Sequence, residues 1–372
     1  MIRIIFILNI VNYNYRGCDY GFKRGEAWIA VYDSVFIMYT EDGGLNWLYI
    51  NPGTQRGLFD IFFIDSLRGW TGGRLGEIRH TQDGGLTWSL QWIGYTKWVA
   101  RIQFLDQLHG YGAAGDYTVF VTSNGGQTWN IVFTQFMGVD FYGIHFISPQ
   151  IGFICSGLPT EFGTPGYVAK SVDGGFTWNT LLEANGFDLF DIWFFNEQKG
   201  IVVGGNDSDT ISPVILKTED GGFTWTQIIP PGYYLRAVHF VSENKGWACG
   251  RFGTIIKTED GGNTWVLQNV GGEHTLFDID FLDSLHGVAS GEDAIFFTND
   301  GGNTWINVNV NEVEKVNKRK IYFSTFPHRK NLKGFKEKVL DITGKENSLK
   351  NLKSGIYFMN SDERKFKFII LK

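Results

Sequence analysis

The chain has 372 residues, 43% hydrophobic and 16% aromatic, with 48 Gly and only 8 Pro, which suits a large core of short, turned strands. Residues 1–310 carry 17 Lys/Arg against 32 Asp/Glu, a net of −15, whereas residues 311–372 carry 16 against 7, a net of +9. This break indicates a domain boundary. The acidic main body argues against nucleic acid as a partner, because nothing there would neutralise phosphates.

The chain begins with MIRIIFILNIV, one early Arg followed by a short apolar run. Residues 1–25 therefore have two readings: a secretory signal, although no small-x-small cleavage site follows, or the inner strand of an otherwise incomplete first repeat. No stretch reaches the roughly 18 apolar residues of a membrane span. The three cysteines, Cys18, Cys155 and Cys249, have no metal-ligand spacing and are expected to be buried, unpaired residues.

One octapeptide, TEDGGFTW at residues 218–225, occurs in seven versions along the chain. Its acidic or Asn position recurs at steps of 41, 41, 49, 47, 40 and 40 residues, which indicates a repeated supersecondary unit. Those positions are Asp42, Asp83, Asn124, Asp173, Asp220, Asp260 and Asp300, and the closing indoles are Trp47, Trp88, Trp129, Trp178, Trp225, Trp265 and Trp305.

Each residue type in the octapeptide suits a tight strand-to-strand turn. Asp or Asn accepts backbone N–H groups just beyond it, Gly-Gly supplies positive φ, and the leading Thr or Ser adds a hydroxyl bond. Trp then covers the turn and fills the gap between neighbouring units. We expect a structural role for these turns; carbohydrate binding by exposed indoles is the alternative. The octapeptide resembles the Asp-box, or BNR, repeat, which implies a turn between the third and fourth strands of a propeller blade.

The unit between the turns predicts four strands. Residues 58–92 alternate in short runs bounded by Gly, giving strands near 58–64, 69–73, 77–82 and 87–92, and residues 234–268 repeat this pattern. Seven such units predict an all-β fold, a seven-bladed β-propeller of four-stranded antiparallel blades at residues 26–310. A linker at 311–320 and a small, sandwich-like β domain at 321–372 are expected to follow.

Alignment of the units places Phe63, Phe104, Phe146, Phe194, Phe240 and Phe281 in the core of the first strands. The positions between core residues vary in polarity. Because the first strand of a blade lines the central channel, we expect these varied residues, together with Arg74 and Arg251 in the loops between second and third strands, to recognise a ligand. The candidates are Asp60, Arg74, Arg101, His145, Asp191, Arg236, His239, Arg251, Asp278 and Asp280.

Catalysis is not expected. No nucleophile–base set, phosphate loop or complete calcium loop is present, so no cofactor and no metal are predicted. Several carboxylates in one channel leave a glycoside hydrolase, sialidase-like or xyloglucan-cleaving, as the alternative. The Arg-Ile-Pro motif of sialidases is absent, and xyloglucan-cleaving enzymes pair two propellers where this chain has room for one.

The repeat also resembles the propeller family of photosystem II stability and assembly factors. The resemblance lies in Ile-x-Phe-x-Asp, Gly-Trp, Gly-x-x-Gly-x-Ile and Thr-x-Asp-Gly-Gly-x-Thr-Trp, over residues 26–309. It implies a non-enzymatic propeller that binds a client protein during assembly of a photosynthetic complex. Such repeats also occur in secreted bacterial proteins.

The C-terminal segment resembles the type A sorting domain of type IX secretion. LDITGKE, LKSGIYFM and the basic ending KFKFIILK carry the resemblance, although the usual Tyr-Pro-Asn-Pro opening is absent. It implies export by an outer-membrane translocon to the surface of a Gram-negative bacterium; a generic basic β-hairpin is the alternative. The sequence thus predicts a secreted or surface-bound monomer that binds protein or glycan at its channel mouth.

Overall fold

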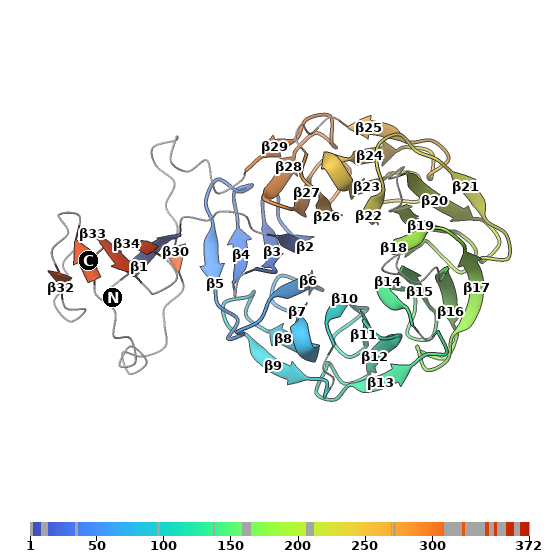
Figure 1. Ribbon diagram of the computed structural model, residues 1–372, viewed down its shortest axis with the longest axis horizontal. Helices are drawn as coiled ribbons and strands as arrows, with labels where there is room; N and C mark the ends of the chain where they lie inside the picture. The colour runs from blue at the N-terminus through green and yellow to red at the C-terminus, as the bar shows by residue number, and fades with distance from the viewer. Residues whose placement is uncertain are drawn as a thin grey trace.

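A computed structural model describes residues 3–8, 14–33, 36–94, 97–136, 138–157, 165–205, 212–268, 270, 273–308, 322–323, 339–341, 346–347, 355–360 and 365–371. Seven antiparallel sheets, each built from four consecutive strands, follow one another round a ring (Figure 1). The predicted seven-bladed β-propeller is therefore confirmed. Among the described residues there is no helix with the length and hydropathy that a membrane crossing needs.

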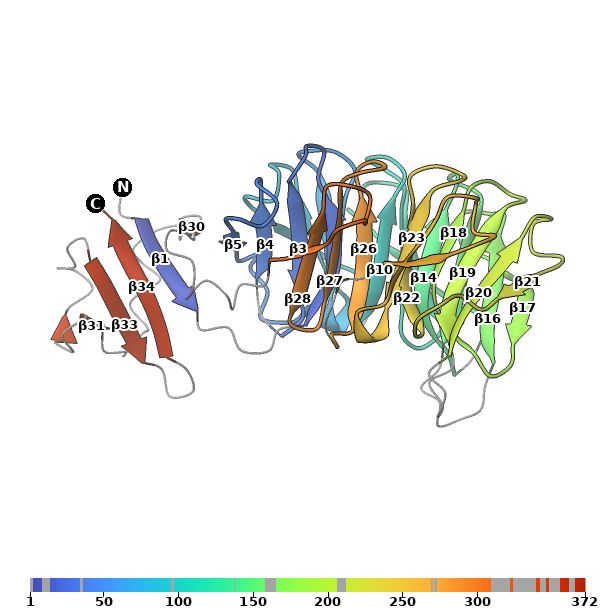
Figure 2. The same cartoon turned by 90° about the horizontal axis from the view of Figure 1, so that it is seen from above.

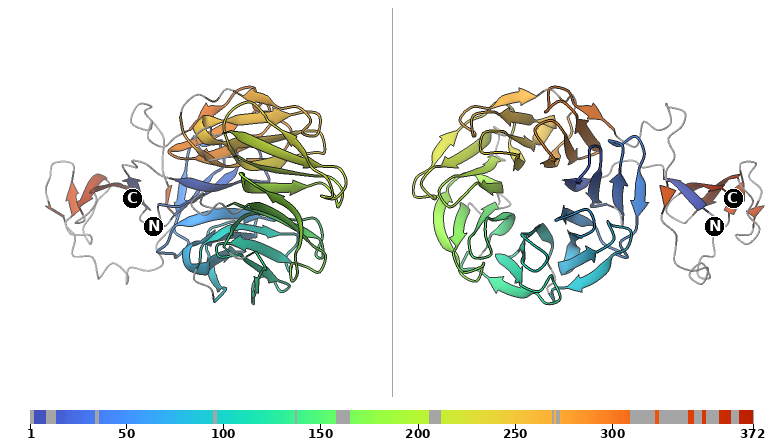
Figure 3. Two further views of the ribbon diagram at one scale, coloured as in Figure 1. Left: turned by 45° about the vertical axis from the view of Figure 1, so that its right-hand side comes forward. Right: turned by 180° about the vertical axis from the view of Figure 1, so that it is seen from behind.

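The four strands of each blade lie side by side in chain order, the first at the hub of the ring and the fourth at its rim (Figures 1 and 3). The inner strands are β2 (Tyr15–Tyr20), β6 (Leu58–Phe63), β10 (Val99–Phe104), β14 (Asp140–Phe146), β18 (Asp188–Phe194), β22 (Leu235–Phe240) and β26 (Leu276–Phe281). The second strands are β3 (Ala27–Val31), β7 (Gly69–Gly73), β11 (Gly110–Ala114), β15 (Gly152–Gly157), β19 (Gly200–Gly205), β23 (Gly246–Gly250) and β27 (Gly287–Gly291).

The two outer positions complete each blade. The third strands are β4 (Ile37–Thr40), β8 (Glu77–Thr81), β12 (Thr118–Thr122), β16 (Gly166–Ser171), β20 (Pro213–Thr218), β24 (Ile255–Thr258) and β28 (Ala294–Thr298). The fourth strands are β5 (Leu48–Ile50), β9 (Ser89–Trp92), β13 (Asn130–Phe133), β17 (Asn179–Ala184), β21 (Thr226–Ile228), β25 (Val266–Gln268) and β29 (Ile306–Asn307). Two short 3₁₀ turns, η1 (Arg74–Gly76) and η3 (Arg251–Gly253), join second to third strands.

The first blade is complete, and its inner strand differs from the one that the apolar start of the chain suggested. That strand is β2, whose sequence YRGCDY pairs with β3. The early apolar run instead forms β1 (Arg3–Leu8), which pairs antiparallel with β34 (Lys365–Leu371) outside the ring (Figure 2). Residues 3–8 are thus not part of a blade.

The described C-terminal strands form one sheet together with β1. Its order is β1, β34, β33 (Gly355–Asn360), β31 (Val339–Asp341) and β32 (Glu346–Asn347). A further short strand, β30 (Tyr322–Phe323), extends the first blade by pairing parallel with β5. The linker expected at 311–320 and most of the sorting-type segment lie outside the described residues.

Neighbouring blades pack through aromatic residues at equivalent positions. Tyr111 of β11 stacks on Phe146 of the next blade's inner strand, with ring centroids 3.5 Å apart, and Trp178 meets Phe146 edge-on at 6.0 Å. Phe146 is 1% exposed and Trp178 is 3% exposed. Stacked and edge-on rings at these separations add to the burial of their apolar area, so each blade covers the face of its neighbour.

The seven octapeptide turns share the bonds from the hydroxyl and from the Asp or Asn side chain to the backbone, and four of the seven indoles also bond to the turn. In the fourth blade, the Ser171 hydroxyl accepts the N–H of Gly175 at 2.8 Å, and Asp173 accepts the N–H of Thr177 at 2.9 Å. Gly174 and Gly175 have φ of 80° and 91°, which a residue with a Cβ rarely adopts. The Trp178 Nε1–H donates to the carbonyl of Gly175 at 3.0 Å, so the indole closes the turn.

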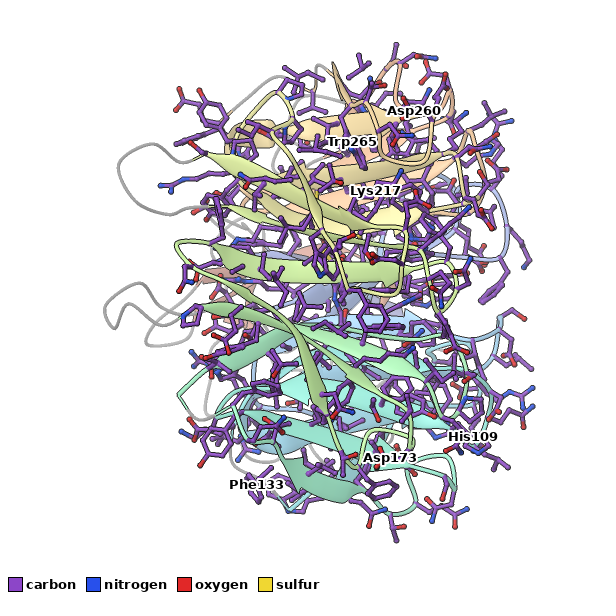
Figure 4. All side chains as sticks on the ribbon, turned by 90° about the vertical axis from the view of Figure 1, so that its right-hand side faces the viewer. His109, Phe133, Asp173, Lys217, Asp260 and Trp265 are labelled. Carbon is purple, nitrogen blue, oxygen red and sulfur yellow. The ribbon has the colours of Figure 1, made fainter. Side chains whose placement is uncertain are left out.

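The octapeptide turns and the 3₁₀ turns lie on opposite faces, because successive strands of a blade are antiparallel. The loops that enter the inner strands lie on the same face as η1 and η3. Figure 4 shows His109, which lies between an inner and a second strand, on the same side as Asp173 and Asp260 of two octapeptide turns. We call the face with η1 and η3 the mouth face and the other the turn face.

Candidate functional site

Every inner strand contains a β-bulge that decides which residues reach the channel. In β6 the register against β7 shifts between Leu58 and Asp60, so Phe59 has no partner opposite it. The other six inner strands shift at the same place. The extra residue breaks the alternation of the strand and turns toward the mouth.

Three of the channel carboxylates join neighbouring blades. Asp60 accepts the N–H of Ile102 at 2.6 Å, and Asp191 accepts that of Val238 at 3.0 Å. Asp278 of the last blade accepts the N–H of Cys18 in the first blade at 2.9 Å. All three are at most 8% exposed. Each of these three predicted ligand-binding residues thus forms a hydrogen bond across a joint between two blades.

Arg101 connects these three carboxylates across the channel. Its guanidinium lies 2.9 Å from Asp278, 3.1 Å from Asp191 and 3.5 Å from Asp60. Burial alone would lower the pKa of Arg101, but the three carboxylates outweigh it and hold that pKa well above its ordinary value. The cation therefore stays charged and links four blades at the hub.

One guanidinium faces three buried carboxylates, so it neutralises only part of their negative charge. Burial raises the pKa of Asp60 to about 7, against the opposing effect of Arg101. Burial raises the pKa of Asp191 as well. A carboxyl that holds its proton more tightly when folded is destabilising in its charged form, so this cluster trades stability for a fixed geometry at the hub.

A second layer of polar residues lies two positions further along the inner strands. In this layer Asp19 accepts the N–H of Phe63 at 2.7 Å, and Asp280 accepts that of Tyr20 at 2.6 Å. Gln103 accepts the N–H of Phe146 at 2.6 Å. The joint between the last and first blades thus has two carboxylate-to-backbone bonds, from Asp278 and Asp280.

The two channel histidines also belong to this second layer. His145 Nδ1 accepts the N–H of Phe194 at 3.1 Å, and burial together with His239 lowers the pKa of His145 to about 4. His239 Nδ1 lies 2.7 Å from Asp280. Burial would raise the pKa of Asp280, but His239 outweighs it and the pKa is lowered. The structure thus brings these predicted site residues together as contacts between blades.

A hollow opens at the mouth face directly above this channel network. It has a volume of about 810 Å³, and Arg101 lies at its boundary with the channel. The bulge residues of all seven inner strands line it, one from each blade: Arg16, Phe59, Ala100, Tyr142, Phe190, Arg236 and Phe277. We call this cavity the mouth hollow.

A chain of six aromatic rings runs along the mouth hollow, and the first five of them line it. Successive centroids are 4.9, 5.5, 5.4, 5.3 and 5.7 Å apart. The rings, which we call the aromatic collar, are Tyr32, Phe59, Trp98, Tyr142, Phe190 and Tyr234. Such contacts hold large apolar side chains rigidly at a solvent-facing surface, where they can contact a ligand at low entropic cost.

Six cations line the mouth hollow, and no Asp or Glu is among its lining residues in the described part of the chain. The cations are Arg16, Arg56, Arg74, Lys97, Arg101 and Arg236. This concentration contrasts with the net charge of −15 that residues 1–310 carry. The field in the mouth hollow therefore favours anions, although most of the surrounding propeller is acidic.

The predicted loop arginines lie at or beside the mouth hollow. Arg74 bonds to the hydroxyl of Tyr32 and stacks on its ring at 4.8 Å. Arg251 stacks on Tyr234 at 5.5 Å and on Phe252 at 5.0 Å. Arg74 and Arg236 thus contribute to the cavity itself, whereas Arg251 lies at the collar's end.

Sequence reasoning missed most of the mouth hollow. Arg16, Phe59, Tyr142, Phe190 and Phe277 were not selected, because strict alternation assigns them to the same face as buried residues. The signal was present nonetheless. The residue just before each channel position is aromatic or Arg in six of seven repeats, which is unusual for a position that packs against varied neighbours.

The three cysteines lie in the core, as expected. Cys18, Cys155 and Cys249 are free and buried, and burial raises the pKa of each thiol. No group of His, Cys, Asp or Glu among the described residues could hold a metal ion. Residues 158–164 and 206–211, between the second and third strands of the fourth and fifth blades, lie outside the described residues.

Comparison with solved structures places the chain among propellers of several activities. YCF48 bound to a D1 peptide has a TM-score of 0.61 and 17% identity, covering 80% of this chain and 97% of that one. YCF48 from Cyanidioschyzon merolae gives 0.58 and 15%, with 80% and 98% covered. A GH74 enzyme from Niastella koreensis gives 0.63 and 16%, covering 95% of this chain but 58% of that one.

These identities establish the fold and not the activity. A WD40 propeller of Doa1 reaches a TM-score of 0.61 at 9% identity, over 79% of this chain and 96% of the other. No protein-family model matches the chain, and no curated protein matches it either.

Proposed function

We propose that this chain is a non-enzymatic binding propeller that holds a segment of a partner protein in its mouth hollow. The observation that carries the proposal is the hollow itself, a cavity of about 810 Å³ with an aromatic collar and six lining cations. Rigid aromatic residues and arginines are the side chains that dominate binding energy at protein interfaces. The structural neighbour YCF48 bound to a D1 peptide supports a polypeptide as the ligand.

The absence of catalysis is part of this proposal. A hydrolase would need two carboxyls free to act as acid and nucleophile or base. In the channel, Asp60, Asp191 and Asp278 share Arg101 and accept backbone N–H groups, and each is buried. The GH74 neighbours keep xyloglucan hydrolysis as the second candidate, and the chain spans 58% and 56% of their lengths.

The proposal includes export. The resemblance of the C-terminal segment to a type IX sorting domain supports a protein that reaches the outer surface of a Gram-negative cell, where the octapeptide turns, resembling Asp-box repeats, would supply a stable scaffold. Cell fractionation followed by mass measurement tests this. We expect the surface form to lack the residues beyond about 310, and full-length protein confined to the cytoplasm would contradict export.

Selection from a displayed library of random decapeptides tests binding. The selected peptides should lose binding when Trp98 or Tyr142 is changed to Ala, because both rings border the mouth hollow. Phe223→Ala is the matched control, since Phe223 is 89% exposed on the turn face. Peptides that bind all variants equally would refute the mouth as the site. Release of reducing ends from xyloglucan oligosaccharides by the wild type, lost in Asp191→Asn, would favour the hydrolase.

A further inference from the structure

Two arginines of the mouth hollow differ from the other cations that line it. Arg56, Lys97 and Arg101 each lie within 4 Å of a carboxylate, on Glu77, Asp116 and Asp278 respectively. Arg16, Arg74 and Arg236 form no ion pair with any residue that the structure describes, and among these three only Arg16 and Arg236 have a buried Nε without a hydrogen-bond partner. Both are half-buried and both line the cavity.

The two arginines occupy equivalent positions. Each is the bulge residue of its inner strand, in the first and sixth blades, which flank the seventh. The Arg16 guanidinium lies 3.9 Å from the ring centroid of Phe277, and that of Arg236 lies 4.1 Å from the centroid of Phe190. Stacking on a ring fixes the plane of a guanidinium and leaves its N–H edge available for hydrogen bonds.

Their hydrogen-bonding capacity is largely unused. Arg236 donates through Nη2 to the hydroxyl of Tyr234 at 2.9 Å. The Nε atoms of both Arg16 and Arg236 are buried and have no hydrogen-bond partner among the described residues. A buried donor without an acceptor costs roughly 1–3 kcal/mol, more when the group is charged. Such a cost is removed when a ligand supplies the acceptor.

The two cations also affect each other. Burial lowers the pKa of Arg16, and the charge of Arg236 lowers it further. Tyr32 and the carboxylates of Asp33 and Glu292 act in the opposite direction. Two like charges held in one cavity repel, and an anion between them would relieve both the repulsion and the missing hydrogen bonds.

We propose that Arg16 and Arg236 form an oxyanion site that selects protein segments by a carboxylate, either an acidic side chain or a chain terminus. This rests on the proposed function, of which it specifies the ligand. Carboxylate is the favoured oxyanion because a polypeptide offers it and because planar guanidinium edges bind it with two parallel hydrogen bonds. Phe277 and Phe190, stacked under the two cations, would contact the apolar part of the same segment.

The first experiment is independent of any peptide. Thermal unfolding is followed with sulfate and with chloride at matched ionic strength, in the wild type and in Arg16→Gln and Arg236→Gln. Sulfate stabilises folded proteins generally, so the site-specific part is the difference from Arg68→Gln, whose Arg pairs with Asp65 on the turn face. We expect each mouth variant to weaken sulfate binding by about tenfold or more, as loss of a charged hydrogen bond predicts.

The variants should also fold at least as well as the wild type in chloride, because removing either charge removes the repulsion. Arg16→Lys keeps the charge but loses the planar guanidinium edge that donates two parallel hydrogen bonds. It replaces Arg16→Gln in the experiment if that variant folds poorly. Equal sulfate responses in the wild type and all mouth variants would overturn the oxyanion site. Sulfate that binds at molar concentration alone would be an adventitious ion only, and this result would overturn the site as well.

The second experiment identifies the source of the carboxylate. Peptides selected as described above are compared in three forms: amidated with Asp or Glu, amidated with Asn or Gln, and Asn or Gln with a free terminus. We expect about a tenfold or greater loss for the form without any carboxylate, and that loss should vanish in Arg16→Gln.

The outcomes separate the two proposals. Peptides that need Trp98 but show no preference for a carboxylate would overturn the oxyanion site and leave the binding function standing. Tighter binding of a polyuronate oligosaccharide than of any selected peptide would overturn both, because the anion would then belong to a glycan. Failure of every peptide, with a sulfate response confined to the wild type, would overturn the protein-binding function and retain the site.

Discussion

On the turn face all seven blades hold the turn backbone through the same Thr or Ser hydroxyl, whereas at the mouth the equivalent inner-strand positions carry Arg, Phe, Ala, Tyr, Phe, Arg and Phe. The hydroxyl of Thr or Ser accepts the N–H of the second Gly in each turn, at 2.8 to 3.0 Å. The contacts that recur in every blade are those made within the blade. The residues differ from blade to blade at the hub, where side chains of different blades meet and must complement one another.

The largest expected effect is on the repetitive side. Replacing Trp178 by Ala should lower the free energy of unfolding by about 3–5 kcal/mol, because the indole is 3% exposed and packs on Phe146 between two blades. Urea denaturation followed by fluorescence measures it. Phe223→Ala, at a turn-face residue that is 89% exposed, is the control and should be neutral. A loss under 1 kcal/mol at Trp178 would show that the turns are not what holds the blades.

At the hub, Arg101→Met should cost about 3 kcal/mol. It leaves the carboxylates of Asp60, Asp191 and Asp278 buried without their cation. Because the carboxyls can then take up protons, the loss should shrink as the pH is lowered from 7 to 5. Denaturation at the two pH values measures this, and a loss that is independent of pH would mean that Arg101 acts by packing alone.

The pH dependence of stability distinguishes two hub residues with opposite signs. His145, with its pKa lowered to about 4, contributes stability above its unfolded pKa of about 6.5 that is lost as the pH falls toward 4. Asp60, with its pKa raised to about 7, contributes stability that increases as the pH falls from about 7 to about 4. The two contributions oppose each other in the wild type.

His145→Gln should reveal the Asp60 contribution. Gln103 makes the same bond to a backbone N–H one blade earlier, so the amide fits this layer. Unfolding of the variant should no longer take up a proton at position 145. Between about pH 6.5 and 4, its free energy of unfolding should therefore rise relative to that of the wild type as the pH falls. Parallel pH profiles for the two proteins would contradict the assignment of a buried neutral histidine.

The smallest effect concerns the carboxylate of a single turn. Asp173→Ala should cost about 1 kcal/mol, through the lost bonds to the N–H groups of Phe176 and Thr177. Asp173→Asn should be nearly neutral, because Asn124 accepts the corresponding N–H of Thr128 at 3.0 Å in the third blade. Thermal unfolding measures both variants. An Asn variant as unstable as the Ala variant would mean that the charge, and not the hydrogen bonds, supports the turn.

The fold followed from the sequence because local residues specify the turns. Gly-Gly, the Asx position and the closing Trp act within eight residues, so each copy could be interpreted by itself. The inner strand of the first blade was missed for the opposite reason. Its sequence YRGCDY has Cys18 and Tyr20 where other blades have Ile and Phe, so the pattern that marks the strand is gone although the pairing with β3 remains.

The site could be predicted only in part. Channel positions such as Asp60 and Asp191 were found by alignment, but their partners are backbone groups of another blade and the guanidinium of Arg101, which no local pattern reveals. Arg16 and Phe277 were missed because a bulge reverses the direction of the side chain that precedes the channel position. A single inserted residue is enough to convert a buried position into a binding one.

Since each of the seven sheets is made from consecutive strands, the polypeptide crosses every joint of the ring except the one between Asp278 and Cys18. That gap is also where the hub supplies a second anchor, from Asp280 to Tyr20. A circular permutant, opened between the third and fourth blades and linked across the old gap, would move the break to a joint where, among the described channel residues, Gln103 supplies the bond to the next inner strand. The backbone amides of the permutant should exchange hydrogen faster than those of the wild type. In the wild type, the additional hub bond lies at the one joint that the polypeptide does not cross.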